Sequence, residues 1–277
     1  MRELIMPGGR SIPVLGQGTW NMGEDPAEQQ HEADALRLGL DLGLRLIDTA
    51  EMYGEGGAEK VVAAALEGRR DEAYIVSKVY PHNAGRRAVQ EACERSLKRL
   101  NTDRIELYLL HWRGGVPLDE TFAGFEALKN AGKILNYGVS NFDRDDMLEA
   151  HATPGGKDVA VNQVLYNLSK RGVEWDLLPW CRQHGVPLMA YSPLEQAGML
   201  NVPALRAVAA LRGATPAQVA LAWLLYQDGV IAIPKAVSAR HVRENAAALE
   251  VRLEAEDLAA LDAAFAPPRR ATPLAMR

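Results

Sequence analysis

Short apolar runs alternate along the chain with longer segments in which apolar residues recur at helical spacing. Uninterrupted apolar runs are typical of parallel strands that are buried on both faces. Eight such runs occur, at 11–15, 44–47, 73–76, 105–110, 134–139, 159–161, 186–190 and 230–233. Eight strand–helix units predict an α/β fold, a single (β/α)8 TIM barrel that spans 1–277 as one domain.

The starts of two predicted helices carry recognisable signals. Thr215 and Gln218 have the spacing of a capping box, with Pro216 at the first helical position. Asp119 stands where it can cap the helix that follows the fourth run. Outside the repeat, the sequence predicts an N-terminal β-hairpin around 7–9 and an extra C-terminal helix over 255–265.

The main alternative to a barrel is an open, doubly wound sheet. Such a sheet usually carries the pattern G-x-G-x-x-G after its first strand. Gly16 and Gly18 begin this pattern, but Asn21 stands where the third glycine belongs. We therefore expect the closed barrel.

Charge and composition narrow the functional classes. A net charge of -5 argues against nucleic acid or an anionic membrane as a partner, because both require a basic face. The start of the chain lacks the apolar stretch of a signal peptide, and no apolar run approaches the roughly 20 residues of a bilayer span. The two cysteines, Cys93 and Cys181, lie in helical segments and are expected to be reduced. We expect a cytoplasmic, monomeric protein.

Polar residues follow seven of the eight runs, at the strand ends where barrel enzymes place their chemistry. They are Asp48 with Tyr53 shortly after it, Ser77 and Lys78, His111 and Trp112, Ser140 and Asn141, Asn162 and Gln163, Tyr191 and Ser192, and Lys235. Turns are polar in general, so one such residue carries little information. An Asp, a Tyr, a Lys and a His at one rim are harder to explain as turn composition.

Asp48, Tyr53, Lys78 and His111 form a chemically coherent set. A free tyrosine has a pKa of about 10, and a neighbouring ammonium lowers that pKa because it stabilises tyrosinate. An aspartate keeps a buried lysine charged, and a neutral histidine can donate a hydrogen bond to a carbonyl oxygen. The set therefore predicts a tuned phenolic proton donor. The histidines show no ligand spacing, so we expect no metal.

At these residues the sequence resembles the aldo-keto reductase family over nearly the whole chain. The resemblance is carried by 16–20, 46–54, 76–79, 110–112, 138–142, 162–164, 191–194 and 233–235. It implies NADPH-dependent reduction of small aldehydes or ketones, with Asp48, Tyr53, Lys78 and His111 as the catalytic tetrad. The stretches 20–24, 50–53 and 177–181 are similar to a bacterial branch associated with methylglyoxal and related carbonyls.

The resemblance also implies where the cofactor binds. The implied contacts are Thr19, Trp20, Asp48, Ser140, Asn141, Gln163, Tyr191, Ser192, Leu194, Lys235, Ser238, Arg240, His241, Glu244 and Asn245. Tyr191 would stack on the nicotinamide, and Lys235 would meet the 2′-phosphate. Ala236 and His241 depart from the family, which often has Ser and Arg at these positions. NADPH is still expected, with NADH as a weaker alternative.

The substrate is expected to meet His111 and an apolar mouth formed by Trp20, Tyr80 and Trp112. The loops over this mouth are short, and the tail after Phe265 is brief. These features predict a short-walled pocket that prefers small, activated carbonyls.

Two other functions remain open. One is a barrel that binds NADP(H) as a redox sensor or auxiliary subunit with little turnover. The other is an isomerase or aldolase that uses Lys78 as a Schiff base, which an adjacent Asp48 opposes because such a lysine needs a lowered pKa.

Overall fold

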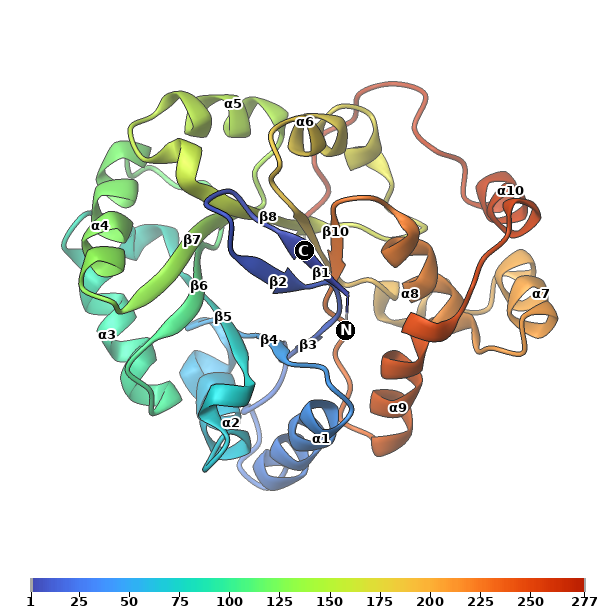
Figure 1. Cartoon of the computed structure of the whole chain (residues 1–277), viewed down its shortest axis with the longest axis horizontal. Coiled ribbons are helices and arrows are strands. Elements are labelled where there is room, and N and C mark those ends of the chain that lie inside the picture. The colour runs from blue at the N-terminus through green and yellow to red at the C-terminus, as the bar shows by residue number, and fades with distance from the viewer. Residues whose placement is uncertain (1, 277) are drawn as a thin grey trace.

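Eight parallel strands form the wall of a barrel in the computed structural model, which describes residues 2–276 (Figure 1). Neighbours in the barrel are also neighbours in the chain: β3 (Gly16–Gly18), β4 (Leu46–Asp48), β5 (Tyr74–Val79), β6 (Ile105–Leu110), β7 (Ile134–Ser140), β8 (Val159–Leu165), β9 (Leu188–Tyr191) and β10 (Val230–Ala232). The barrel closes between β3 and β10, where Leu15 pairs in parallel with Ala232. The predicted (β/α)8 fold is confirmed.

Helices surround the barrel (Figure 1). They are α1 (Gln29–Asp41), α2 (Gly57–Ala65), α3 (Ala88–Leu100), α4 (Leu118–Asn130), α5 (Arg144–Ala152), α6 (Leu177–Gln183), α7 (Pro203–Leu211), α8 (Pro216–Tyr226), α9 (Ala239–Ala247) and α10 (Ala255–Ala264). Short 3₁₀ turns connect them: η1 (Tyr53–Gly56), η2 (Arg70–Glu72), η3 (Pro81–Asn83), η4 (Gly156–Asp158), η5 (Gly172–Glu174), η6 (Glu195–Ala197) and η7 (Ala248–Glu250). The predicted tail helix is α10.

The two predicted helix starts have different outcomes. The capping box of α8 is confirmed, because the Gln218 N–H donates to Thr215 Oγ1 at 3.2 Å and the Thr215 N–H donates to Gln218 Oε1 at 2.8 Å. The prediction that Asp119 caps α4 is wrong, since the helix begins one residue earlier, after Pro117. Asp119 lies in the first turn instead, where its negative charge still suits the helix dipole.

The run 11–15, predicted as the first barrel strand, is instead mostly part of the hairpin. Ser11–Pro13 forms β2, which pairs antiparallel with β1 (Glu3–Ile5). The first barrel strand is β3, whose glycines give no apolar signal. A Cβ on Gly18 would lie 2.9 Å from the Ile233 carbonyl oxygen, so side chains cannot enter where β3 meets the end of β10.

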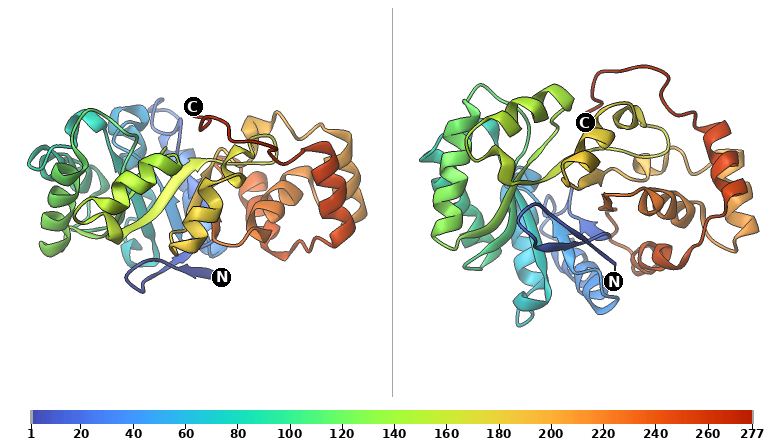
Figure 2. Two further views of the ribbon diagram at one scale, coloured as in Figure 1. Left: turned by 90° about the horizontal axis from the view of Figure 1, so that it is seen from above. Right: turned by 45° about the horizontal axis from the view of Figure 1, so that its top comes forward.

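The hairpin closes one end of the barrel. Met6 and Ile12 are buried with the side chains that fill the barrel interior, among them Leu46 and Met189. Figures 1 and 2 show the hairpin across this end, and Figure 2 shows the end of the C-terminal tail at the opposite one. The open end is therefore the one where the strands finish.

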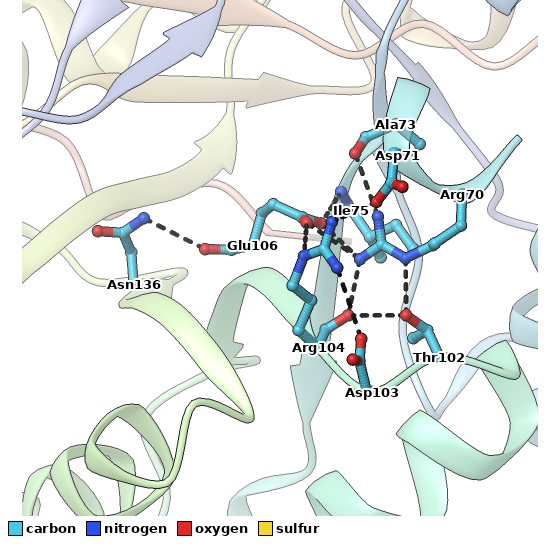
Figure 3. Close-up of polar contacts among 9 residues, drawn as sticks. All are labelled: Arg70, Asp71, Ala73, Ile75, Thr102, Asp103, Arg104, Glu106 and Asn136. Atoms are coloured by element: carbon cyan, nitrogen blue, oxygen red, sulfur yellow. Dashed lines mark hydrogen bonds and ion pairs between the residues drawn. The ribbon is translucent and has the colours of Figure 1, made fainter.

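A polar network ties the strands together near their starts (Figure 3). The buried Glu106 carboxylate accepts hydrogen bonds from Arg70 Nη2 at 2.9 and 3.0 Å and from the Ile75 N–H at 2.8 Å. Asn136 Nδ2 donates to the Glu106 carbonyl oxygen at 3.2 Å. The network joins β5, β6 and β7 at the end of the barrel far from the polar strand ends.

We expect Glu106→Ala to lower the free energy of unfolding by about 3 kcal/mol, because the partly buried Arg70 guanidinium loses its ion pair and the buried Ile75 N–H loses its acceptor. Urea denaturation followed by circular dichroism measures this change. Asp103→Ala is the control, since this neighbouring side chain is 86% exposed and its loss should change stability by less than about 0.5 kcal/mol. Equal losses for both variants would contradict the role given to Glu106.

Candidate functional site

A cavity of about 660 Å³ opens where the barrel strands end. It is lined by Gly18, Trp20, Asn21, Asp48, Met52, Tyr53, His111, Trp112, Ser140, Asn141, Gln163, Tyr191, Ser192, Pro193, Leu194, Gln196, Ile233, Pro234, Lys235 and Met276. Most of the residues predicted from the strand ends therefore share one cavity, as the topology of a parallel barrel requires.

The Lys78 ammonium is buried behind Asp48 and Tyr53, which line this cavity, and it joins three groups. It donates to Asp48 Oδ2 at 2.8 Å, to the Thr49 carbonyl oxygen at 2.8 Å and to the Tyr53 hydroxyl at 3.1 Å. The Lys78 side chain is 0% exposed and that of Asp48 is 4% exposed. All three ammonium hydrogens thus have an acceptor, which a buried cation requires.

Strand alternation explains why Lys78 points inward. Val76 belongs to the barrel interior, and Ser77 points outward, where its hydroxyl donates to Glu59 on α2 at 2.7 Å. The next residue, Lys78, must then face the interior again.

Tyr53 is carried to the cavity by a tight turn after β4. The Tyr53 N–H donates to the Ala50 carbonyl oxygen at 3.1 Å, and the chain then passes through left-handed conformations at Gly54 and Glu55, with φ of 55° and 52°. This turn places the Tyr53 hydroxyl beside Lys78 and lets α2 start immediately afterwards.

Burial dominates the protonation of Tyr53. It raises the pKa of Tyr53 by more than the Lys78 charge lowers it, so the net shift is upward. The sequence predicted that the Lys78 charge lowers the pKa of Tyr53. This prediction is wrong for the net shift, because burial outweighs the charge. Tyr53 keeps its proton at neutral pH, and Lys78 remains available to stabilise the phenolate once the proton has left.

Lys78 itself stays charged. Burial alone would lower the pKa of Lys78, but the charges of Asp48 and Tyr53 and their hydrogen bonds raise it above its usual value. Burial raises the pKa of Asp48, and Lys78 opposes that shift. A Schiff-base role needs a neutral lysine, so this environment disfavours that alternative.

His111 is held as a neutral imidazole. Burial and the nearby Lys78 charge lower its pKa to about 2. Its ring lies edge-on to Tyr53, with ring centroids 5.8 Å apart, and its buried Nδ1 atom has no hydrogen-bond partner. A neutral His111 can donate to an oxygen bound beside the Tyr53 hydroxyl.

Amide groups form the wall of the cavity beside Asp48. Gln163 Nε2 donates to Asp48 Oδ1 at 2.7 Å, and Asn141 Nδ2 donates to the His111 carbonyl oxygen at 3.1 Å. The Tyr191 hydroxyl donates to Asn141 Oδ1 at 2.9 Å. An aromatic ring, two amides and, farther along, the Lys235 ammonium are the chemistry that suits a nicotinamide dinucleotide with its phosphates.

Several predicted site residues do not line the cavity. Thr19, Lys78, Tyr80, Ser238, Arg240, His241, Glu244 and Asn245 lie outside its lining. Thr19 is buried and donates from Oγ1 to the Asp48 carbonyl oxygen at 3.0 Å. Ser238 caps α9, and Arg240 pairs with Glu244 at 2.8 Å on the surface of that helix. Tyr80 stands behind Trp112 rather than in the cavity.

Some of the lining was not predicted from the sequence, including Asn21, Met52, Gln196 and Met276. Met52 is inside a motif already singled out, and its position next to Tyr53 could have indicated it. Met276 had no such signal. The tail returns from α10 to the open end of the barrel, so it is not too brief to reach the cavity (Figure 2).

Among residues 2–276, no group of three or more His, Cys, Asp or Glu side chains is arranged to hold a metal ion.

Comparisons with known proteins place this site in context. Residues 14–266 match the model of the aldo/keto reductase family. The chain is 53% identical to methylglyoxal reductase YeaE of Escherichia coli over 96% of this chain and 95% of that protein. It is 34% identical to glyoxal reductase of Bacillus subtilis over 92% and 90% of the two chains. A crystal structure of a Klebsiella pneumoniae aldo/keto reductase with NADP and acetate superposes with a TM-score of 0.97, at 50% identity and 99% coverage of both chains.

We expect His111 to remain neutral from pH 8 down to pH 5, because its pKa is lowered to about 2. Proton NMR of the histidine Cε1–H signals tests this, and the signal lost in His111→Gln identifies the residue. Its chemical shift should stay constant across the range. A midpoint at about 6.5, the value of a free imidazole, would contradict the protonation state assigned here.

Proposed function

The chain belongs to the aldo/keto reductase family, and we propose that it reduces methylglyoxal and other small aldehydes and ketones to alcohols with NADPH. One observation carries this proposal: the Tyr53 hydroxyl faces the cavity while Lys78, itself paired with Asp48, donates to it at 3.1 Å. A phenol that accepts a hydrogen bond from a buried ammonium can donate its proton to a carbonyl oxygen bound in the cavity.

When bound, NADPH supplies the hydride that the carbonyl carbon accepts. Tyr53 donates its proton to the carbonyl oxygen, and the Lys78 ammonium stabilises the phenolate that remains. Asp48 keeps Lys78 charged and in place. His111, neutral at working pH, orients the oxygen by a hydrogen bond. The product alcohol has gained one proton from Tyr53. Water reprotonates the Tyr53 phenolate between turnovers.

We propose that the cofactor lies along the wall from Tyr53 to α9. Ser140, Asn141 and Gln163 would hold the carboxamide beside Tyr191. Thr19, Trp20 and Asp48 would support the neighbouring ribose, Ser192 and Leu194 the pyrophosphate, and Lys235, Ser238, Arg240, His241, Glu244 and Asn245 the adenosine 2′-phosphate end.

NADPH is the preferred cofactor because Lys235 offers the 2′-phosphate a charge-assisted contact. Arg240 is paired with Glu244 on the surface. It must give up this ion pair before it can make a second charge-assisted contact with the 2′-phosphate. His241 supplies no fixed charge where the family often has Arg. NADH is therefore a weaker alternative rather than an excluded one.

We also propose that 1–277 is one barrel domain that acts as a cytoplasmic monomer, without nucleic acid or membrane as partners. The free, buried thiols of Cys93 and Cys181 and the net charge of -5 support this proposal. No single helix within residues 2–276 is long and apolar enough to cross a membrane. Taken together, α7 and α8 have the length and composition of a membrane-spanning segment, but the pair is bent by 88°.

We expect Tyr53→Phe to reduce kcat for methylglyoxal by about 10²-fold to 10⁴-fold, because the proton donor is gone. The Kd for NADPH, measured by fluorescence titration, should change by less than about twofold, since the hydroxyl contributes little to cofactor affinity. Tyr226→Phe, on the exposed end of α8, is the matched control and should keep full activity. Loss of NADPH binding together with activity would contradict the assigned role of Tyr53.

We expect catalytic efficiency on methylglyoxal to exceed that on a 3-ketosteroid by about 10-fold to 200-fold. Trp20, Met52, Trp112 and Met276 offer only a few apolar contacts, so little binding energy is available to orient a large ketone. Initial rates of NADPH oxidation on both substrates decide this. Equal or better turnover of the steroid would mean that the pocket walls include residues assigned here to packing.

A further inference from the structure

Glu51 is a buried carboxylate for which the proton-transfer chemistry has no use. It is 8% exposed and lies two residues before Tyr53. Its Oε1 atom accepts hydrogen bonds from the Tyr80 N–H at 2.8 Å and from Asn83 Nδ2 at 3.1 Å. Burying a carboxylate costs free energy unless hydrogen bonds compensate. The role of Glu51 in the fold is therefore to accept these two hydrogen bonds.

Hydrogen bonds, rather than an ion pair, account for the position of Glu51. The cation that approaches it is Arg95, whose Nη2 atom lies 4.0 Å from Oε2 and whose side chain is 50% exposed. Such a distant, solvated pair contributes little. A neutral amide at position 51 could accept the same two hydrogen bonds, which makes glutamine a conservative replacement.

The segment held by Glu51 supports the loop that follows β6. The Tyr80 ring meets the Trp112 ring edge-on, with centroids 5.9 Å apart and planes at 89°. One residue on, Pro81 leaves no room at Gly114, where a Cβ would lie 2.4 Å from the Pro81 Cβ. The two loops therefore touch at two points, and moving Tyr80 must disturb Trp112.

Trp112 carries this contact into the cavity. Its ring lines the cavity and lies against His111, with ring centroids 4.8 Å apart. On the other side, the Glu51 N–H donates to the Lys78 carbonyl oxygen at 3.3 Å. Glu51 thus belongs to the segment that carries the proton donor and links this segment to the residues behind the aromatic wall.

We propose that Glu51 is a specificity-determining positioning residue, which holds the Tyr80 segment behind Trp112 and so fixes the aromatic wall of the carbonyl site. This inference rests on the proposed reductase function. Glu51 touches neither the reacting atoms nor the cavity, so it acts on how a substrate side group is held and not on proton transfer. Its effect should be largest for a carbonyl whose side group packs on Trp112.

Phenylglyoxal and methylglyoxal form a suitable pair of probes, because both are keto aldehydes and only the first carries a ring. In Glu51→Ala we expect the KM for phenylglyoxal to rise by about fivefold to tenfold, as expected for a few lost apolar contacts. The kcat, the KM for methylglyoxal and the Kd for NADPH should each change by less than about twofold. Glu51→Gln should restore the wild-type KM, because it keeps the acceptor.

A double-mutant cycle with Trp112→Ala tests whether Glu51 acts through that ring. If it does, Glu51→Ala will raise the KM for phenylglyoxal in the wild-type background and leave it unchanged in Trp112→Ala. Additive effects, failure of Glu51→Gln to rescue, or a fall in kcat at unchanged KM would each overturn the inference. If Glu51→Ala does not fold, Tyr80→Leu removes the supporting ring directly and should produce the same KM increase; an unchanged KM there overturns it equally.

The wild-type enzyme separates this inference from the proposed function. If it oxidises NADPH with neither keto aldehyde, the proposed function fails and the inference fails with it. If it is active and Glu51→Ala behaves like wild type, only the inference fails.

Discussion

The burial of one ammonium group is the constraint around which the functional end of the barrel is arranged. Lys78 is fully enclosed, so its charge is tolerable only if each of its hydrogens meets an acceptor. The acceptors come from the end of β4, the residue after it and the turn that follows, which fixes β4, β5 and η1 relative to one another. The same geometry that makes the cation stable places a phenol beside it at the cavity floor.

The two ends of the barrel have different roles: contacts at the strand starts stabilise the fold, and the polar groups of the cavity lie at the strand ends. At the starts of the strands, the hairpin fills the interior with Met6 and Ile12, and Glu106 ties three strands together. At the strand ends, charged and polar groups pair with one another around an open cavity. Barrel enzymes commonly show this division, because loops at one end can vary while the closed end keeps the strands in register.

Buried carboxylates other than Asp48 form hydrogen bonds within the segments around the cavity. Glu59 accepts from Ser77, the neighbour of Lys78, at 2.7 Å and from Arg99 Nε at 2.5 Å. Glu32 accepts the Gly23 N–H at 2.8 Å in the loop that carries Trp20, and Glu51 holds the segment behind Trp112. Each of these carboxylates accepts hydrogen bonds from backbone or side-chain donors near the cavity, although none of the three lines it.

The sequence alone determined that strands and helices alternate, and it predicted that Asp48, Tyr53, Lys78 and His111 act together. Apolar periodicity is a local property, and the ends of parallel strands in a barrel necessarily meet at one rim, so Asp48, Lys78 and His111 could be brought together without coordinates. Only the tertiary structure decided the rest. Gly16–Gly18 is a strand because distant backbones pack against it, Tyr80 lies behind Trp112, and Met276 reaches the cavity after the chain has gone around α10. The net pKa shift of Tyr53 likewise depends on how far surrounding segments exclude water, a sum over contacts between residues far apart in the chain that no local pattern records.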